Sequence, residues 1–355
     1  MYIRAKVVSK DGTDLPDEEE VSTANLWMNS LFNYLELSLN GKIVSAKPFY
    51  NYIAYIKARL GHTGYNNAKK LDTALHREET NLDEANATNP GYSKRKTYIA
   101  NSKIVELCGD LYDDIFECQR YILPSVEARL KLVRSPNELN IWCTDENKDK
   151  GYKTIVETAI LYTKKHILVQ DIRELHLRQL EKTPAIYPYI KSELKTFLIP
   201  KSSQSSVSEN IFSTSKLPFR IILGLVKTSS FNGSYSENPY SFQTFDMSSM
   251  KITVNSDASI YKNHNIALND TNKLLAYQFF RESLKDGFDL SRETFTDGCN
   301  FFVFELTSSS AITEGGFKIE INFKKPLVDP LTAVVLAQLN SSFTIDKFAN
   351  VELLN

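Results

Sequence analysis

The chain has 355 residues, a mass of 40.4 kDa and a formal net charge of −1, from 42 Lys and Arg residues against 43 Asp and Glu residues. A composition of 42% hydrophobic and 24% charged residues is typical of a soluble globular protein and excludes a disordered chain. The lack of a basic excess argues against a protein that coats nucleic acid. No apolar run approaches the ~18 residues that span a bilayer, so we expect a globular protein without a membrane span.

Alternation of apolar and polar residues predicts β-strands from the N-terminus onward. Leu35, Leu37 and Leu39 alternate with polar residues and are followed by Asn40-Gly41, which predicts a half-buried strand ending in a tight hairpin turn. Similar alternation occurs at residues 3–7, 128–132, 302–306 and 317–324. Two continuous apolar runs, 219–226 and 331–339, are typical of strands buried on both faces, although periodicity alone leaves a helix open there.

Three helices are predicted among these strands, at residues 48–60, 168–182 and 272–286. The first is the best marked, because Pro48 stands where a first helical residue is favoured and Gly61 where a helix stops. So few helices cannot alternate with so many strands. Antiparallel β-sandwiches are therefore favoured over a parallel α/β fold.

A boundary between two domains is predicted near residue 188. The helix predicted at 168–182 is followed by the proline-punctuated sequence TPAIYPY, after which a new strand is expected. Serine is frequent beyond residue 200, where KSSQSSVSEN is either a flexible linker or a surface loop. The two parts, 1–187 and 188–355, share a coarse order of strands, a helix and strands, which favours a duplicated architecture.

No pattern for catalysis, metal binding or cofactor binding is found, and we predict that the protein is not an enzyme. The sequence contains no GxSxG elbow and no Walker loop. None of the five histidines lies in an HExxH sequence; they are His62, His76, His166, His176 and His264. A dyad of Cys143 with His166 is a less favoured alternative to a buried thiol and a surface imidazole. The four cysteines form no CxxC pair and fit reduced thiols in a cytosolic protein.

Two charged clusters are expected to be solvated. The basic run at 93–96 lacks the interleaved aromatic residues of a nucleic-acid site, so a solvated loop is favoured. The acidic cluster lacks the alternating ligand spacing of a calcium loop, and a solvated turn is favoured for its members, which are Asp110, Asp113, Asp114 and Glu117.

The segment 231–240 is predicted to be an ordered structural loop. Its turn residues set the backbone, since glycine adopts positive φ without steric cost and proline fixes φ. Its aromatic rings are too large to remain in water, so the loop is expected to fold back onto the sandwich or, as the alternative, to contact a neighbouring subunit. The residues that define it are Phe231, Asn232, Gly233, Tyr235, Asn238, Pro239 and Tyr240.

Five stretches of the sequence have a specific pattern. In chain order they are YIRAKVVSKDGTDL at 2–15, NSLFNYLELSLNGKIV at 29–44, ILPSVEARLKLVRS at 122–135, the segment FNGSYSENPYSF from Phe231, and FTIDKFANVELL at 343–354. Together they resemble the major capsid proteins of Polintons (Mavericks), virus-like DNA transposons related to adintoviruses and virophages. The most specific is FNGSYSENPYSF, where the family has an FNG-Y-x-x-NPF-F pattern and Tyr240 here replaces the usual Phe.

The resemblance implies an all-β double jelly roll, made of two antiparallel eight-stranded β-sandwiches with a few short helices in the connections. It implies a structural function: a homotrimer that forms pseudo-hexameric capsomers of an icosahedral shell, together with penton and minor capsid proteins. The expected location is the virion, after synthesis as a soluble intracellular protein, without specific nucleic-acid binding and without a cofactor.

Relatives in this family usually carry a segment ahead of the YIRAKVV-like strand, and that segment contributes early strands of the first jelly roll. The first jelly roll, 1–187, is therefore expected to lack these strands and to expose a strand edge. The alternative function is a host-adopted or defective copy of such an endogenous viral element, which would act as an interaction protein without forming particles.

Overall fold

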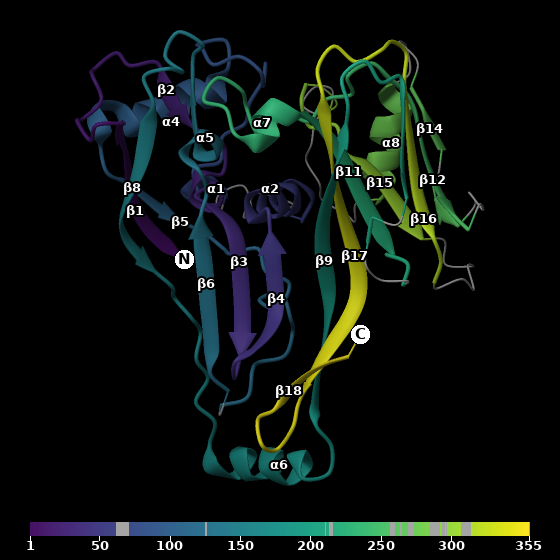
Figure 1. Ribbon diagram of the computed structural model, residues 1–355. Helices are drawn as coiled ribbons and strands as arrows, with labels where there is room; N and C mark the ends of the chain where they lie inside the picture. The colour runs from purple at the N-terminus through teal and green to yellow at the C-terminus, as the bar shows by residue number, and fades with distance from the viewer. Residues whose placement is uncertain are drawn as a thin grey trace.

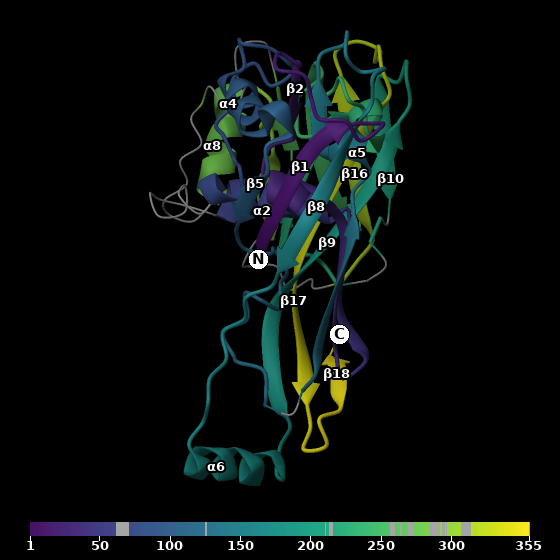
Figure 2. The ribbon, with the colours of Figure 1, turned by 90° about the vertical axis from the view of Figure 1, so that its left-hand side faces the viewer.

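The computed structural model describes residues 1–61, 71–124, 126–209, 211–212, 216–255, 260–262, 265–268, 273–283, 292, 295, 297–306 and 314–354. Two β-sandwiches stand side by side with their strands roughly upright, and a helix lies below them like a foot (Figure 1). In the view turned by 90° the molecule is narrower, and the helix at the bottom, α6 (Gln170–Leu180), lies apart from both sandwiches (Figure 2).

The second sandwich has two antiparallel sheets of the jelly-roll order. One sheet runs β9 (Ala185–Ile199), β17 (Leu331–Ile345), β11 (Arg220–Lys227), β15 (Phe302–Leu306) and β13 (Tyr261–Lys262), and β18 (Val351–Leu354) pairs with the end of β17. The other runs β10 (Ser205–Glu209), β16 (Phe317–Phe323), β12 (Met247–Val254) and β14 (Asn265–Ala267).

The first sandwich repeats the same pairings with fewer strands. Its sheets run β5 (Val105–Cys108), β1 (Tyr2–Ser9), β8 (Tyr152–Ile160) and β4 (Lys42–Pro48), β3 (Phe32–Leu39), β6 (Ala128–Arg134). A small ladder joins β2 (Val21–Thr23) to β7 (Ile141–Cys143). The all-β double jelly roll expected from the resemblance is confirmed, and the first roll has six strands in its two sheets among the described residues.

Burial follows the strand patterns. The alternating strand β16 buries Phe317, Ile319, Ile321 and Phe323 and leaves the residues between them half-exposed. The continuous run in β17 is buried on both faces, and β17 pairs with β9 on one side and β11 on the other. The Asn40-Gly41 turn joins β3 to β4 with φ of 47° and 79°, which are the positive values that a two-residue hairpin requires.

The three predicted helices are present with shifted ends. They are α2 (Tyr50–Gly61), α6 (Gln170–Leu180) and α8 (Lys273–Ser283); residues 284–286 of the third prediction lie outside the described residues. Helix α2 begins two residues later than Pro48 predicts, because Pro48 is the last residue of β4 and Phe49 has a φ of 54°.

Further helical segments were not predicted. The longest of them, α4, is capped by the Asn89 side chain, which accepts a hydrogen bond from the Tyr92 N–H at 3.0 Å. They are α1 (Trp27–Ser30), α4 (Pro90–Ile99), η1 (Ala100–Ser102), α5 (Asn137–Asn140) and α7 (Thr228–Asn232).

Candidate functional site at the interface between the jelly rolls

Helix α2 lies between the two sandwiches and contributes to the core of each. Tyr52, Ile53 and Ile56 belong to the core of the second roll. Tyr50 and Ala54, on the opposite side of the helix, belong to the core of the first roll. Because both cores share this helix, the two sandwiches are packed as one body, and α2 marks the interface between them (Figure 1).

The aromatic loop 231–240 of the second roll packs against this helix. The Phe231 ring lies 4.9 Å from the Tyr52 ring, and the Tyr240 ring stacks on Tyr55 with centroids 4.3 Å apart and an interplanar angle of 5°. Aromatic pairs at such distances add stabilisation beyond the area they bury. The loop therefore joins the second roll to the first within one chain.

The turn residues of the loop have definite conformations and partners. Gly233 has a φ of 109°, and a Cβ atom there would lie 3.1 Å from the Glu138 Cβ. Asn232 is exposed, whereas Pro239 and Asn238 are buried. The Asn238 amide donates a hydrogen bond to the Leu82 carbonyl at 2.9 Å, and Leu82 lies in the long connection between β4 and β5 of the first roll. The backbone of the loop is thus held by the other roll.

Tyr235, in the middle of the loop, binds the first roll. Its hydroxyl donates to the Tyr152 carbonyl at 2.7 Å, and its own carbonyl accepts the Cys143 N–H at 2.6 Å. The rings of Tyr235 and Tyr152 lie edge to face, with centroids 6.0 Å apart. Both partners belong to strands of the first roll, β8 and β7.

Replacing Tyr235 by alanine is expected to destabilise the folded chain by about 2–3 kcal/mol, because a half-buried ring and its hydrogen bond are lost. Since these contacts lie within one chain, monomers and any oligomers should lose thermal stability equally. Thermal unfolding of size-separated fractions measures this. Tyr162→Ala is a matched control, since Tyr162 is 71% exposed. Dissociation of oligomers into stably folded monomers would instead place Tyr235 at a contact between subunits.

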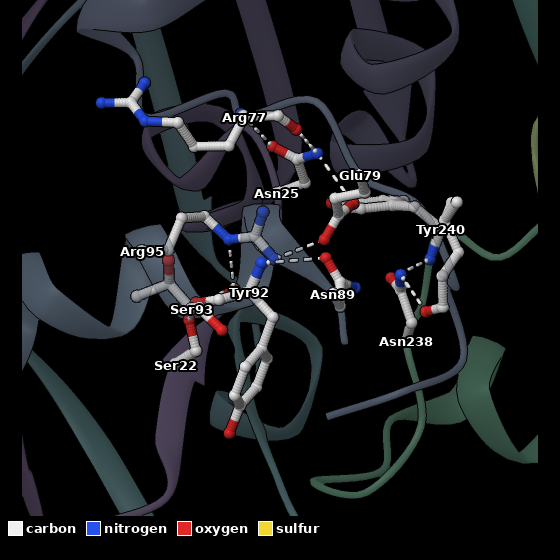
Figure 3. A network of polar contacts seen from close by, with 12 residues as sticks. Ser22, Asn25, Arg77, Glu79, Asn89, Tyr92, Ser93, Arg95, Asn238 and Tyr240 are labelled. Atoms are coloured by element: carbon white, nitrogen blue, oxygen red, sulfur yellow. Dashed lines mark hydrogen bonds and ion pairs between the residues drawn. The ribbon is translucent and has the colours of Figure 1, made fainter. Parts of the chain in front are cut away.

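A buried polar network lies within the first roll (Figure 3). The Arg95 guanidinium donates to the Glu79 carboxylate at 2.6 Å and to the Thr23 carbonyl at 2.9 Å. The Asn25 amide donates to the same carboxylate at 2.8 Å. Arg95 and Glu79 are 0% and 4% exposed, and a buried charge is tolerated when it is paired and hydrogen-bonded in this way.

A second buried cluster joins the edge strand β9 to the first roll. The Ser192 N–H donates to the Asp114 carboxylate, and the Ser192 carbonyl accepts from Lys47, each at 2.6 Å. Asp114 also pairs with Lys47 and, at 2.6 Å, with Lys57 of α2. Burial acts to raise the pKa of Asp114, but the two lysines more than offset it and hold that pKa below its ordinary value. The cluster satisfies backbone groups that an edge strand would otherwise leave unpaired.

These clusters correct two expectations about solvated charges. The basic run 93–96 is not a loop but part of α4, and its Arg95 is fully buried. The acidic cluster is not wholly solvated, because Asp113 and Asp114 are buried while Asp110 and Glu117 are exposed. No sequence pattern indicates the partners, since Glu79 lies 16 residues from Arg95 and Lys47 lies 67 residues from Asp114 along the chain.

The histidines and cysteines are distributed over separate surroundings. Cys143 is buried in β7, where burial raises the pKa of its thiol to about 12, whereas the His166 ring is exposed and packs on Tyr121. Burial and the charges of Arg59 and Arg95 hold the pKa of His76 well below its ordinary value. In the part of the chain that the structure describes, no group of three or more His, Cys, Asp or Glu residues is arranged to hold a metal ion. His62 and His264 lie outside that part.

Comparison with solved structures identifies the class of fold. The chain matches a chain of the Sputnik virophage structure with a TM-score of 0.59 and 12% identity, over 99% of this chain and 81% of that one. It matches the PBCV-1 virus capsid with a TM-score of 0.55 and 9% identity, over 100% of this chain and 89% of that one. The fold is therefore that of the double jelly-roll capsid proteins of virophages and large DNA viruses.

Sequence comparison is less specific. No protein-family model matches the chain. The chain is 22% identical over 252 residues to the uncharacterized protein F54H12.2 of Caenorhabditis elegans. The matched region covers 67% of this chain. The chain spans about 60% of the length of that curated relative.

Proposed function

We propose that the chain is a major capsid protein of a Polinton (Maverick)-like endogenous viral element. In this role three copies form a pseudo-hexameric capsomer of an icosahedral shell. The chain belongs in the virion after synthesis as a soluble intracellular protein, and its partners are further copies together with penton and minor capsid proteins. The observation that carries the proposal is the pair of upright jelly rolls packed as one body, in the fold of virophage and PBCV-1 capsid proteins.

The division of the chain supports a capsomer of six sandwiches. We propose one jelly roll for 1–187 and one for 188–355, with β9 beginning three residues before that boundary, at Ala185. Since α2 and the loop 231–240 hold the two rolls together, each subunit presents two sandwiches in a fixed arrangement. Three such subunits supply six sandwiches, which is the number a pseudo-hexagonal tile requires.

The surface of the single chain supports assembly. Its accessible area is 17776 Å², whereas a compact monomer of this mass exposes about 14,500 Å². Helix α6 has no buried residue, and apolar side chains on and beside it are widely exposed, including Ile167 at 90% and Leu175 at 61%. Apolar surface of this extent is typical of protein–protein contacts.

A structural role is also supported against an enzymatic one. The solved structures of virophage and PBCV-1 capsids share the fold at a TM-score above 0.5, and the buried charged groups Arg95, Glu79 and Asp114 pair with groups of the same chain. No helix among the described residues is long and apolar enough to cross a membrane.

The oligomeric state tests the proposal. Mass photometry at micromolar concentration is expected to show a species of about three times 40.4 kDa. Stable interfaces bury more than ~1,000 Å², and the chain exposes more surface than a compact monomer of its mass. Negative-stain microscopy should show pseudo-hexagonal capsomers or particles. A monomer that persists under all salt conditions would favour the host-adopted copy that forms no particles.

A further inference from the structure

A buried histidine lies beside the contact between the two rolls. His76 belongs to the connection between α2 and α4 and is 7% exposed. Its Nε2 atom lies 3.2 Å from the Nη1 atom of Arg59, a residue of α2. An arginine side chain can only donate hydrogen bonds, so the His76 ring accepts this bond through Nε2. The ring is therefore neutral and carries its proton on Nδ1.

Arg59 connects this histidine to the second roll. Its other terminal nitrogen, Nη2, donates to the Cys299 Sγ at 3.7 Å, and the Tyr55 hydroxyl of α2 lies 3.8 Å from the same sulfur. Cys299 belongs to the second roll and is 1% exposed. The contact continues beside it, where the Asn81 N–H donates to the Asp297 carboxylate at 2.5 Å. The neutral ring of His76 thus helps to hold Arg59 in place against the second roll.

A positive charge on the His76 ring would meet other positive charges. Arg59 faces the ring from α2, Arg95 approaches from α4, and Arg77 follows His76 in the chain. Burial and then these three arginines hold the pKa of His76 well below its ordinary value, because both effects disfavour the protonated ring.

The other titratable groups of this region do not offset that repulsion. The Cys299 thiol is the nearest one of the second roll, and burial raises its pKa, so it carries no negative charge at neutral pH. Burial likewise raises the pKa of the Tyr55 hydroxyl. Each nearby carboxylate is already paired with one of the arginines: Glu78 with Arg59, Glu79 with Arg95, and Asp72 with Arg77.

We propose that His76 is an acid-sensitive switch on the contact between the two rolls. A protonated imidazole has two N–H donors and no acceptor, so it loses the hydrogen bond from Arg59 and adds a fourth positive charge to the three arginines. Arg59 then moves away from the ring and from Cys299. The contact of α2 with the second roll loosens, while the sheets of each roll keep their own cores. The switch acts within one chain and operates whether or not the chain builds a shell.

The pH range of the switch follows from the direction of this effect. The neutral ring stabilises the closed contact fully above about pH 6.5, the ordinary pKa of histidine. As the pH falls below that value, opening becomes more favourable by up to ~10-fold for each pH unit, until the lower folded-state pKa is passed. The pKa of Asp114 is lower than that of an ordinary aspartate, so its ion pairs with the lysines remain charged throughout this range.

The accessibility of the Cys299 thiol reports opening of the contact. The chain is treated with 4,4′-dithiodipyridine, which modifies thiols at acidic as well as neutral pH, and the modified cysteines are identified by mass spectrometry. The exposed Cys108 in the same sample corrects for the effect of pH on the reagent. The labelling rate of Cys299 relative to Cys108 should rise at least about 10-fold between about pH 7.5 and pH 5.0.

Two histidine variants form a matched pair for this measurement. His76→Gln keeps a side-chain oxygen that can accept from Arg59 but cannot titrate, so its relative rate should change less than about 2-fold over the same range. His176→Gln removes an exposed histidine of α6 and should keep the rise seen in the parent chain. An equal rise in His76→Gln and the parent chain, or no rise in the parent chain, would overturn the proposal.

Direct titration of the ring tests the switch without changing His76. In the chain labelled with ¹³C and ¹⁵N at histidine, the His76 signals are assigned by replacing each other histidine in turn with glutamine. At neutral pH the ¹⁵N shifts should show Nε2 as the unprotonated nitrogen, and the ring should take up a proton only below about pH 6.5, together with the rise in Cys299 labelling. A His76 ring that is already protonated at pH 7 in the folded chain contradicts the proposal. So does a ring that stays neutral while Cys299 becomes reactive.

Discussion

Replacement of Arg95 by methionine is expected to lower the free energy of unfolding by about 3–5 kcal/mol, since it leaves the Glu79 carboxylate buried without its charged partner. Arg95 and Glu79 are 0% and 4% exposed, and the remaining donor, the Asn25 amide, is neutral. The guanidinium also holds the Thr23 carbonyl of β2. Urea denaturation followed by tryptophan fluorescence measures the change, because Trp142 packs edge to face on Tyr92 of the same helix.

Two further variants separate the effect of burying an unpaired charge from the effect of removing an arginine. Arg129→Met removes an exposed partner of Glu127, with both side chains more than 70% exposed, and should change stability by less than about 0.5 kcal/mol. The double variant Arg95→Met with Glu79→Met should recover part of the loss, because a buried ion pair can often be replaced by apolar residues. A loss at Arg95 no larger than that at Arg129 would show that the Arg95–Glu79 pair does not stabilise the first roll.

The strands were predictable because their signal is local. Alternation at 317–324 and the Asn40-Gly41 turn each specify conformation within a few residues, and both elements are present as expected. Helix α2 was predicted for the same reason. Its dual role was not, because a helix that is apolar on two sides gives the same local signal whether it packs on one core or two.

The charged clusters were misjudged because their burial depends on distant partners. A run of basic residues predicts solvation when it is read alone, and nothing near Arg95 in the sequence announces Glu79. Asp114 is likewise buried only because Lys47, Lys57 and the backbone of Ser192 meet it in the folded chain. Such pairings arise from contacts between residues distant in the chain, within the first roll and, at Ser192, between the rolls, and no periodicity encodes them.

The loop 231–240 lies between these cases. Its turn residues and aromatic content predicted an ordered segment that avoids water, and its rings pack on Tyr52 and Tyr55. Sequence reasoning left open whether the loop meets its own sandwich or another subunit. The contacts described here run to the other roll of the same chain, a third arrangement that depends on the duplication. We propose that the loop holds the two rolls together, and the variant Tyr235→Ala tests this.

Replacing Asp114 by asparagine is expected to cost about 3–5 kcal/mol at neutral pH, because the change keeps the shape but leaves Lys47 and Lys57 buried without their shared carboxylate. The two lysine side chains are 3% and 9% exposed. Since the same carboxylate accepts the Ser192 N–H, exchange of that amide in β9 should accelerate, which reports the contact between the rolls rather than stability alone. Glu117→Gln is the control, because Glu117 is a 60% exposed partner of Lys57 and should contribute little.

The pH dependence of this effect has a defined sign. The folded-state pKa of Asp114 lies below its ordinary value, despite the opposing effect of burial, because Lys47 and Lys57 favour the charged form. Its contribution to stability is therefore complete above about pH 4, the ordinary pKa of an aspartate, and is lost as the pH falls through the lower folded-state pKa. Burial raises the pKa of the neighbouring Asp113, but Asp113 is present in both proteins and largely cancels in the comparison. The stability difference between the parent chain and Asp114→Asn should accordingly be greatest at neutral pH and shrink below about pH 4. Denaturation at a series of pH values measures it, and a difference that stays constant down to pH 2 would mean that the charge of Asp114 does not hold the two rolls together.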